Sequence, residues 1–376
     1  MNNMIKVLIS FGTRPEAIKM APLIQCLKQD SRFEVKVLVT AQHREMLDQV
    51  LDAFNIHTDF DLNLMQKNQS LNKLSANILN SMDEVYDQYR PHIVLVHGDT
   101  LSAFVVAQSA FYNQIDIGHV EAGLRTYNLK SPWPEEGNRQ LISKIASLHF
   151  APTALAALCL EQEKIKSESI FITGNTVIDA LLSASEQKLP LPKNYDMSEF
   201  IFKNHTKKIL ITGHRRENFG QGFINICQAI KDLALKNPQI EFIYPVHMNP
   251  NVKDTVFNLL KDINNISLLP PQSYFEFVNL MKNSDLILTD SGGIQEEAPS
   301  LGIPVLVMRD TTERQEAVDA GTVKLVGTTE SSIKFWVEKL LVDRDFYQKM
   351  SQSSNPYGDG KASLRIKDIL LENYST

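Results

Sequence analysis

Short apolar, β-branched segments alternate with longer segments of helical periodicity along most of the chain. This alternation is typical of a parallel β-sheet whose strands are connected by crossover helices. The segments IVLV, ILIT and LILT are almost continuously apolar, as expected for strands that are buried on both faces. The pattern predicts strands at residues 5–10, 34–40, 93–97, 117–120, 148–150, 170–173, 209–212, 242–246, 266–269, 286–289, 305–307 and 323–326.

The chain is long enough for two hydrophobic cores. Its 376 residues suit two domains of roughly 150 to 200 residues each. The composition shifts once, between about residues 185 and 208, where Pro, Lys and polar residues gather without a clear period in SEQKLPLPKNYDMSEF. We therefore predict an α/β protein with two doubly wound, Rossmann-like domains and a linker near this segment.

Composition excludes several classes of protein. Apolar residues make up 43% and charged residues 22%, as in ordinary globular proteins, so disordered and collagen-like chains are excluded. With 38 Lys and Arg against 44 Asp and Glu, the net charge of −6 offers no basic excess for binding along a nucleic acid. No segment approaches the roughly 18 apolar residues of a membrane span, and the apolar stretch at the start is too short for a signal peptide. We expect a cytoplasmic protein with neither nucleic-acid nor membrane partners.

The cysteines and histidines form no metal-binding motif. Cys26, Cys159 and Cys227 are scattered, with no CxxC spacing, and no HExxH segment occurs. The sequence therefore predicts no disulfide framework and no metal site, which fits a reducing cytoplasm.

Ligands bind open parallel sheets beyond the carboxyl ends of the strands. Chemically distinctive residues are therefore most informative where they directly follow a predicted strand. Those residues are Arg14, Gln42, His43, Gly98, Asp99, Glu121, His214, His247 and the Ser291-Gly292-Gly293 turn. Because they occur in both halves of the chain, we expect the active site in the cleft between the two domains.

The turn TDSGGIQEEA connects a predicted strand to a helix. Its two glycines leave backbone N–H groups available for phosphate at the positive end of the helix, although they also suit a tight turn without a ligand. Glu297, one turn into that helix, suits the hydroxyls of a sugar. Basic residues near strand ends could bind a diphosphate, or each could form a surface ion pair. They are Arg14, Lys19, Arg139, Arg215 and Arg314.

Carboxylates near strand ends or in the loop SPWPEEGNR suit proton transfer when burial raises their pKa values. They are Asp99, Glu121, Glu135 and Glu136. Asp99 has the alternative role of a helix N-cap, and Glu135 and Glu136 that of first-turn helix acids. His214 and His247 suit phosphate binding or proton transfer, and the alternative for each is a structural imidazole, as for His43 and His119.

Many separate motifs occur in the order of one family. They are FGTRPEAIKMAPL, TAQHREMLDQVL, HGDT, GHVEAGLRT, SPWPEEGNRQL, FAPT, GNTVIDAL, ITGHRREN, DSGGIQEEAPSLGIPVLVMRDTTER and GTVKLVG. By these motifs, which run from Lys6 to Gly327, the chain resembles the non-hydrolysing UDP-N-acetylglucosamine 2-epimerases.

The resemblance implies a GT-B-like fold with the sugar nucleotide between two Rossmann-like domains, in a homodimer. The first domain would comprise residues 1–175, joined by a C-terminal helix at about 360–376, and the second residues 176–359. The implied reaction interconverts UDP-N-acetylglucosamine and UDP-N-acetylmannosamine for polysaccharide synthesis. It proceeds by anti elimination of UDP through 2-acetamidoglucal and requires neither a metal nor a cofactor.

The resemblance also implies roles for individual residues. Catalytic positions match Asp99, Glu121, Glu135 and His214. Substrate-binding positions match Arg14, Lys19, Arg139, Phe277, Ser291, Gly292, Gly293, Glu297 and Arg314. Positions that bind a second UDP-N-acetylglucosamine as an activator match Gln42, His43, Glu136, Arg215 and His247. Asn68 stands where regulated members have Arg, Gln315 replaces a frequent Pro, and Tyr127 stands where Gly is common.

Three other functions compete with this interpretation. A hydrolysing relative would release N-acetylmannosamine and UDP, because water would intercept the same intermediate. A GT-B glycosyltransferase would transfer the sugar to an acceptor, often at a membrane, but no basic amphipathic segment is evident near the first domain. A non-enzymatic sugar-nucleotide sensor would not need so many carboxylates at strand ends.

Overall fold

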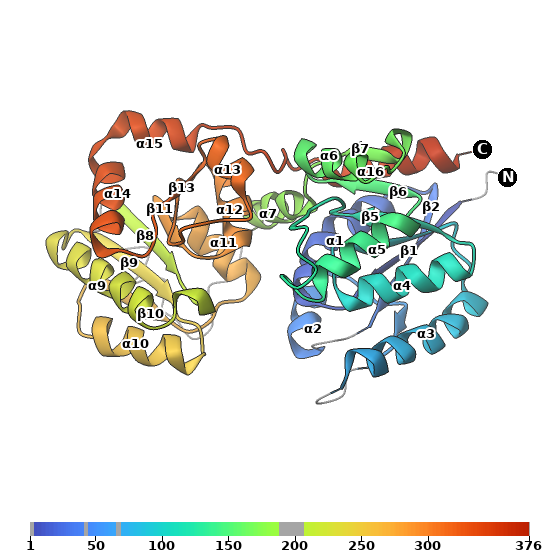
Figure 1. Ribbon diagram of the computed structural model, residues 1–376, viewed down its shortest axis with the longest axis horizontal. Coiled ribbons are helices and arrows are strands. Elements are labelled where there is room, and N and C mark those ends of the chain that lie inside the picture. The colour runs from blue at the N-terminus through green and yellow to red at the C-terminus, as the bar shows by residue number, and fades with distance from the viewer. Residues whose placement is uncertain (1–3, 41–43, 65–68, 188–206, 376) are drawn as a thin grey trace. The chain divides into compact units, whose positions relative to one another are not determined.

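The computed structural model describes residues 4–40, 44–64, 69–187 and 207–375 (Figure 1). The chain forms two compact units, the first of Met1–Ala180 with Tyr357–Thr376 and the second of Leu181–Pro356. The boundary at residues 180 and 181 lies inside helix α7 (Thr176–Glu186), whereas the sequence placed it before that helix. The predicted linker lies largely outside the described residues.

The first unit contains a parallel sheet of seven strands in the order β3-β2-β1-β4-β5-β6-β7. The strands are β1 (Ile5–Phe11), β2 (Phe33–Val39), β3 (Phe60–Asp61), β4 (Ile93–His97), β5 (Asp116–Val120), β6 (Leu148–Ala151) and β7 (Ile170–Ile172). The helices besides α7 are α1 (Arg14–Lys28), α2 (Arg44–Ala53), α3 (Leu71–Gln88), α4 (Leu101–Tyr112), α5 (Glu135–Ile145), α6 (Ala154–Gln162) and α16 (Ala362–Tyr374).

The second unit contains a parallel sheet of six strands in the order β10-β9-β8-β11-β12-β13. The strands are β8 (Lys207–Thr212), β9 (Ile240–Pro245), β10 (Ile266–Leu269), β11 (Leu286–Thr289), β12 (Val305–Val307) and β13 (Val323–Leu325). The helices are α9 (Gln221–Lys236), α10 (Pro250–Leu260), α11 (Tyr274–Lys282), α12 (Gly292–Glu297), α13 (Gln315–Asp319), α14 (Glu330–Val342) and α15 (Arg344–Ser351).

Both sheets confirm the predicted α/β, doubly wound class. All predicted strands are present, and the sequence missed the two-residue β3, which is too short for an apolar pattern. In each sheet the order reverses beside the first strand, at β1 and β4 in the first unit and at β8 and β11 in the second. Loops diverge at such a reversal, so it opens a crevice at the carboxyl ends of the strands.

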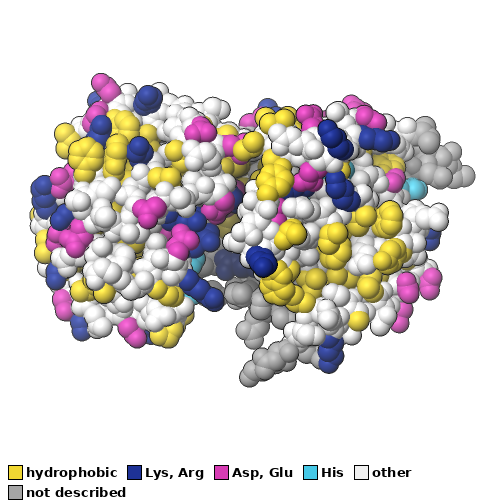
Figure 2. Space-filling model, viewed as in Figure 1, with side chains coloured by type: hydrophobic (Ala, Val, Ile, Leu, Met, Phe, Trp, Pro, Cys, Tyr) yellow, Lys and Arg dark blue, Asp and Glu magenta, His cyan; other side chains and the backbone are white. Residues whose placement is uncertain are grey.

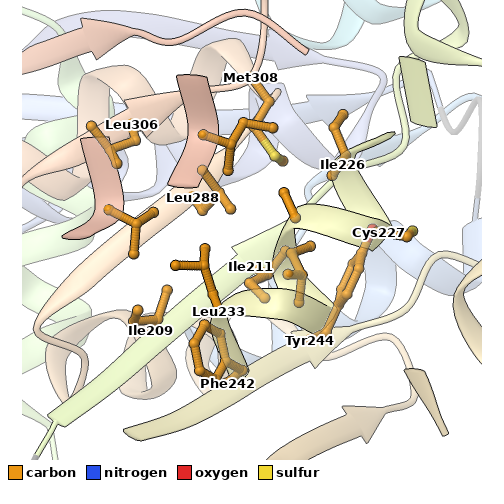
Figure 3. Close-up of a cluster of buried hydrophobic side chains, with 14 of the residues drawn as sticks. Ile209, Ile211, Ile226, Cys227, Leu233, Phe242, Tyr244, Leu288, Leu306 and Met308 are labelled. Atoms are coloured by element: carbon orange, nitrogen blue, oxygen red, sulfur yellow. The ribbon is translucent and has the colours of Figure 1, made fainter. Parts of the chain in front are cut away.

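A fully buried apolar core supports the second sheet (Figure 3). Ile209 and Ile211 of β8 lie beside Phe242 of β9, and Cys227 of α9 packs on the same face. Cys227 is buried, Cys26 and Cys159 are half-buried, and all three thiols are free.

The C-terminal helix α16 belongs to the first unit and lies against α1 (Figure 1). Its first turn is capped by Asp179 of α7, whose carboxylate accepts hydrogen bonds from the backbone N–H groups of Ala362 at 3.1 Å and Ser363 at 2.8 Å. A helix leaves its first N–H groups without intrahelical acceptors, so this carboxylate stabilises the start of α16.

Candidate active site

Glu121 follows β5 and has a left-handed backbone, with φ of 63°. Such a conformation is unfavourable for a residue with a side chain and is typical of functional turns. Its buried carboxylate forms an ion pair with Lys19 of α1 and accepts a hydrogen bond from Nδ2 of Asn175 at 2.9 Å. The resemblance assigned Lys19 to phosphate or sugar; in the structure its ammonium group contacts Glu121, and the binding role stays a prediction.

His97, the last residue of β4, was not singled out from the sequence. Its Nε2 lies 3.7 Å from Oε2 of Glu121. Burial lowers the pKa of His97 to about 4, against the opposing effect of Glu121, so its ring is neutral near pH 7. His119 of β5 is structural: its Nε2 is 2.7 Å from the carbonyl oxygen of Gly98, which fixes the turn before Asp99.

Asp99 follows β4 and forms an ion pair with Arg139 of α5. The side chain of Asn138 donates to the carbonyl oxygen of Asp99 at 2.9 Å, so α5 holds this loop at two points. The alternative that Asp99 caps α4 is wrong. Thr100 is the N-cap, and its hydroxyl accepts a hydrogen bond from the N–H of Ala103 at 3.1 Å.

Glu135 and Glu136 lie in the first turn of α5, as their alternative role predicted. Glu135 is half-buried. Glu136 is fully buried, and its carboxylate accepts hydrogen bonds from the N–H groups of Thr126 and Tyr127, each at 3.0 Å. Burial raises the pKa of Glu136, but these hydrogen bonds, with those from Gln140 and the charge of Arg139, outweigh it and lower the pKa. The observed contacts of Glu136 hold the 126–127 loop, and its activator role stays a prediction.

Glu16 of α1 organises the crevice beside β1 and was missed from the sequence. Its buried carboxylate accepts hydrogen bonds from the N–H groups of Gly12 at 3.1 Å and Thr13 at 2.8 Å, and from the hydroxyl of Thr100 at 2.7 Å. The same carboxylate therefore holds the loops that follow β1 and β4. Arg14, next to Thr13, is half-buried, and burial lowers its pKa.

Asp290 follows β11 in the second unit. Its buried carboxylate accepts hydrogen bonds from the N–H groups of His214 at 2.9 Å and Arg215 at 2.8 Å. The rings of His214 and His247 are stacked, with centroids 5.1 Å apart. Burial lowers the pKa of His214, and the nearby His247 and Arg215 lower it further, while the negative charge of Asp290 raises it. Because the net effect is a lowered pKa, the imidazole is neutral at pH 7. The structure thus brings together His214 and His247, which follow different strands, and adds Asp290, which was not singled out from the sequence.

The Ser291-Gly292-Gly293 turn lies at the start of α12, where backbone N–H groups have no intrahelical acceptor. A side chain at Gly292 would approach Oε1 of Glu313 to 2.7 Å, so a Cβ there requires Glu313 to move. At Gly293 the nearest atom to such a Cβ would be Oε2 of Glu297, at an ordinary 3.9 Å, so space alone does not require both glycines.

Other predicted nucleotide contacts lie on α11, on α12 and beside α13. The hydroxyl of Tyr274 donates to Glu297 at 3.2 Å, and burial raises the pKa of Tyr274 well above its usual range, which keeps this donor protonated. Phe277 is half-buried one turn further along α11. Arg314 forms an ion pair with Glu296 of α12. Gln42, His43 and Asn68 lie outside the described residues.

Among the residues that the structure describes, no group of three or more His, Cys, Asp or Glu side chains could hold a metal ion. Within the same residues, no helix is long and apolar enough to cross a membrane.

Two doubly wound sheets with polar clusters at their carboxyl ends define a GT-B-like α/β protein. The solved structure of the glycotransferase of kitacinnamycin shares this fold, with a TM-score of 0.65 at 9% identity over 100% of both chains. More specifically, the chain belongs to the UDP-N-acetylglucosamine 2-epimerase family, whose model matches residues 25–371.

Close relatives support this membership over nearly the whole chain. The UDP-N-acetylglucosamine 2-epimerase of Campylobacter jejuni is 54% identical over 374 residues, covering 98% of this chain and 97% of the relative. That of Escherichia coli K12 is 54% identical over 372 residues, covering 98% and 99%. The crystal structure of the Neisseria meningitidis enzyme bound to UDP-GlcNAc has a TM-score of 0.87 at 52% identity, covering 98% of this chain and 100% of that one.

Proposed function

We propose that this chain interconverts UDP-N-acetylglucosamine and UDP-N-acetylmannosamine by inverting carbon 2 of the sugar, without releasing free sugar. One observation carries the proposal: carboxylates at the ends of the adjacent strands β4 and β5 each contact a cation, Asp99 with Arg139 and Glu121 with Lys19. The similar N. meningitidis enzyme bound to UDP-GlcNAc supports the substrate.

The chemistry explains why such carboxylates are needed. The proton on carbon 2 is not next to a carbonyl group, so it is too weakly acidic for direct removal. When the bond between carbon 1 and the UDP oxygen breaks, its electron pair leaves with UDP, and positive charge on the sugar acidifies that proton. A base then removes the proton, and the carbon–carbon double bond of 2-acetamidoglucal forms. Protonation on the opposite face, with UDP returning to carbon 1, gives the epimer.

This scheme requires acid-base groups on both faces of the sugar. In our proposal Asp99, Glu121 and Glu135 transfer protons and stabilise the positive charge on the sugar. The ion pairs with Arg139 and Lys19 hold the carboxylates of Asp99 and Glu121 in place.

The second unit would hold UDP, so that it does not escape between the two half-reactions. The N–H groups of Ser291, Gly292 and Gly293 would bind the diphosphate. Neutral His214, fixed by Asp290, would donate a hydrogen bond to the leaving diphosphate. Phe277 would contact uracil and Glu297 the ribose, with Arg14, Arg139 and Arg314 near the phosphates or sugar.

The elimination mechanism is tested by running the reaction in deuterated water and following carbon 2 by NMR. We expect solvent deuterium at carbon 2 of both epimers with no added cofactor, because the base exchanges its proton with solvent while UDP is detached. Retention of the original hydrogen would contradict elimination.

The same incubation separates the two competing enzymes. Free N-acetylmannosamine with stoichiometric UDP as the main products would identify a hydrolysing enzyme. Turnover only when an acceptor is added would identify a glycosyltransferase.

The proposal extends to assembly, regulation and location. We place the enzyme in the cytoplasm as a homodimer that supplies bacterial cell-surface polysaccharide synthesis. Exposed apolar side chains gather over α4 and α5 (Figure 2), including Phe111, Tyr112 and Leu141, and suit a surface that is buried in a dimer. In regulated members of the family a second UDP-N-acetylglucosamine acts as an activator, and the matching positions here are Gln42, His43, Glu136, Arg215 and His247. Asn68 replaces the Arg of regulated members, which argues against activation of this enzyme.

A further inference from the structure

Asn175 contacts the candidate catalytic carboxylate with one end of its side chain. Its Nδ2 donates to Oε2 of Glu121 at 2.9 Å, and the residue is only 3% exposed. The two positions are 54 residues apart in the chain. A hydrogen bond between a buried amide and a carboxylate is shorter and stronger than a neutral one, so it restricts where the carboxylate can lie.

The other groups of Asn175 bind the two segments through which the chain leaves and re-enters the first unit. Its Oδ1 accepts a hydrogen bond from the N–H of Val177 at 3.0 Å, which caps α7, the helix in which the first unit ends. Its backbone N–H donates to the carbonyl oxygen of Tyr357 at 2.7 Å, where the chain re-enters. One residue therefore joins Glu121, the outgoing helix and the returning segment.

Close backbone packing fixes the returning segment against Asn175. A Cβ on Gly174 would lie 3.4 Å from the Cα of Gly358, and both glycines have positive φ, of 86° and 132°. Arg365 of α16 donates to the carbonyl oxygen of Thr173 at 2.9 Å. Because its backbone is held on both sides, the Asn175 amide has little freedom to follow a moving carboxylate.

The geometry points to Asn175 as a positioning residue that holds the Glu121 carboxylate at a defined place relative to α7 and to the segment that begins at Tyr357. This inference rests on the proposed catalytic role of Glu121. Lys19 supplies charge to the same oxygen from a long, flexible side chain, whereas Asn175 supplies a short donor on a rigid backbone. Asn175 thus fixes the direction of the carboxylate, whereas Lys19 forms an ion pair with it.

The test uses Asn175→Ser in the full-length enzyme. Serine keeps an oxygen that can cap α7 but is too short to reach Glu121. We expect kcat to fall about 10- to 100-fold, with KM for UDP-N-acetylglucosamine unchanged within about 3-fold, because the interaction acts on the reacting group rather than on binding. Asn175→Asp, which keeps the cap and replaces the donor with an acceptor, should lower kcat at least as much.

Asp179→Asn is the matched control. Asp179 holds the same returning chain at Ala362 and Ser363 without contacting Glu121 in any described hydrogen bond. We expect this variant to lower the melting temperature while kcat stays within about 2-fold of the parent. If it lowers kcat as much as Asn175→Ser does, or if either Asn175 variant turns over normally, the positioning role is wrong.

Glu121→Gln, assayed in parallel, separates this inference from the proposed function. Normal turnover by Glu121→Gln would overturn the catalytic role of Glu121 and the inference with it. An inactive Glu121→Gln beside a fully active Asn175→Ser would overturn the inference alone.

Discussion

Glu121 is constrained in two ways at the scale of the residue. Its backbone is left-handed, and groups from β4, α1 and the start of α7 surround one carboxylate oxygen. A side chain held this way is already oriented before the substrate binds, which is the arrangement that acid-base catalysis favours.

Removing the charge of this carboxylate tests its role. We expect Glu121→Gln and, separately, Asp99→Asn to lower kcat by at least about 100-fold, because under the proposed mechanism each loses a group that transfers a proton. Turnover is measured by NMR of the two epimers. The matched control is Asp116→Asn, at the opposite end of β5, which should retain normal turnover. A variant at Glu121 or Asp99 with near-normal turnover would leave that residue with a structural role.

Tyr127 is a second residue with an unfavourable backbone conformation. It has φ of 57° and stands where Gly is common in the family, and its side chain is 57% exposed. Gly adopts positive φ at no steric cost, so Tyr127→Gly should leave the free energy of unfolding unchanged or raise it by up to about 1 kcal/mol.

Urea unfolding measures this change, with Leu129→Gly as the control. Leu129 is equally exposed at 57% but is not among the positive-φ residues described. Its replacement by Gly should lower the free energy of unfolding by about 0.5–1 kcal/mol. Equal losses from both variants would contradict the backbone explanation.

At the scale of the element, three adjacent strands each bury a histidine. His97, His119 and His149 belong to β4, β5 and β6, and burial lowers the pKa of the first two to about 4 and about 3. Burial also lowers the pKa of His149. The strands that end at the candidate site are therefore built around neutral imidazoles.

This predicts an acid-sensitive first unit. Since the folded pKa values lie below the unfolded value of about 6.5, the unfolded chain binds more protons below that pH. These histidines contribute fully to the free energy of unfolding above about pH 6.5. Each histidine loses up to about 1.4 kcal/mol of that contribution for every pH unit below this, until the pH reaches its pKa in the folded protein.

Urea midpoints between pH 7 and pH 5 measure the effect. The slope of the free energy of unfolding against pH gives the number of protons taken up on unfolding. His119→Gln should reduce that number by about one, whereas His57→Gln, at an exposed position, should not change it. A slope that is the same in His119→Gln and the parent would contradict the assignment.

At the scale of the whole molecule, both units offer groups suited to a nucleotide diphosphate. Arg14 belongs to the first unit, and His214 and the 291–293 turn belong to the second. From the sequence we expect one UDP-sugar to be bound by groups of both units, and this expectation stays a prediction.

Calorimetric titration with UDP tests this prediction. Arg14→Gln and His214→Asn, one in each unit, should each weaken binding about 10-fold, as expected for a lost hydrogen bond to a charged group. Arg32→Gln, whose ion pair with Asp30 is on the surface, should bind UDP normally. If only one of the two unit-specific variants binds UDP more weakly, binding by both units is contradicted.

Much of the architecture could be predicted because it depends on patterns that are local in the sequence. Apolar runs of three to seven residues marked the strands, and polar residues directly after them marked the loops at their carboxyl ends. The exceptions were local too: β3 is too short to show a pattern, and Thr100 rather than its neighbour Asp99 caps α4.

The sequence by itself determined the two-sheet class, the family and the chemical types available at the strand ends. Only the tertiary structure decided which of these groups meet. Glu16 and Thr100 are 84 residues apart, Glu121 and Asn175 are 54 apart, and His214 and Asp290 are 76 apart. Such contacts form when parallel strands distant in the chain become neighbours, and burial then shifts pKa values that depend on the surrounding protein rather than on the neighbouring residues in sequence.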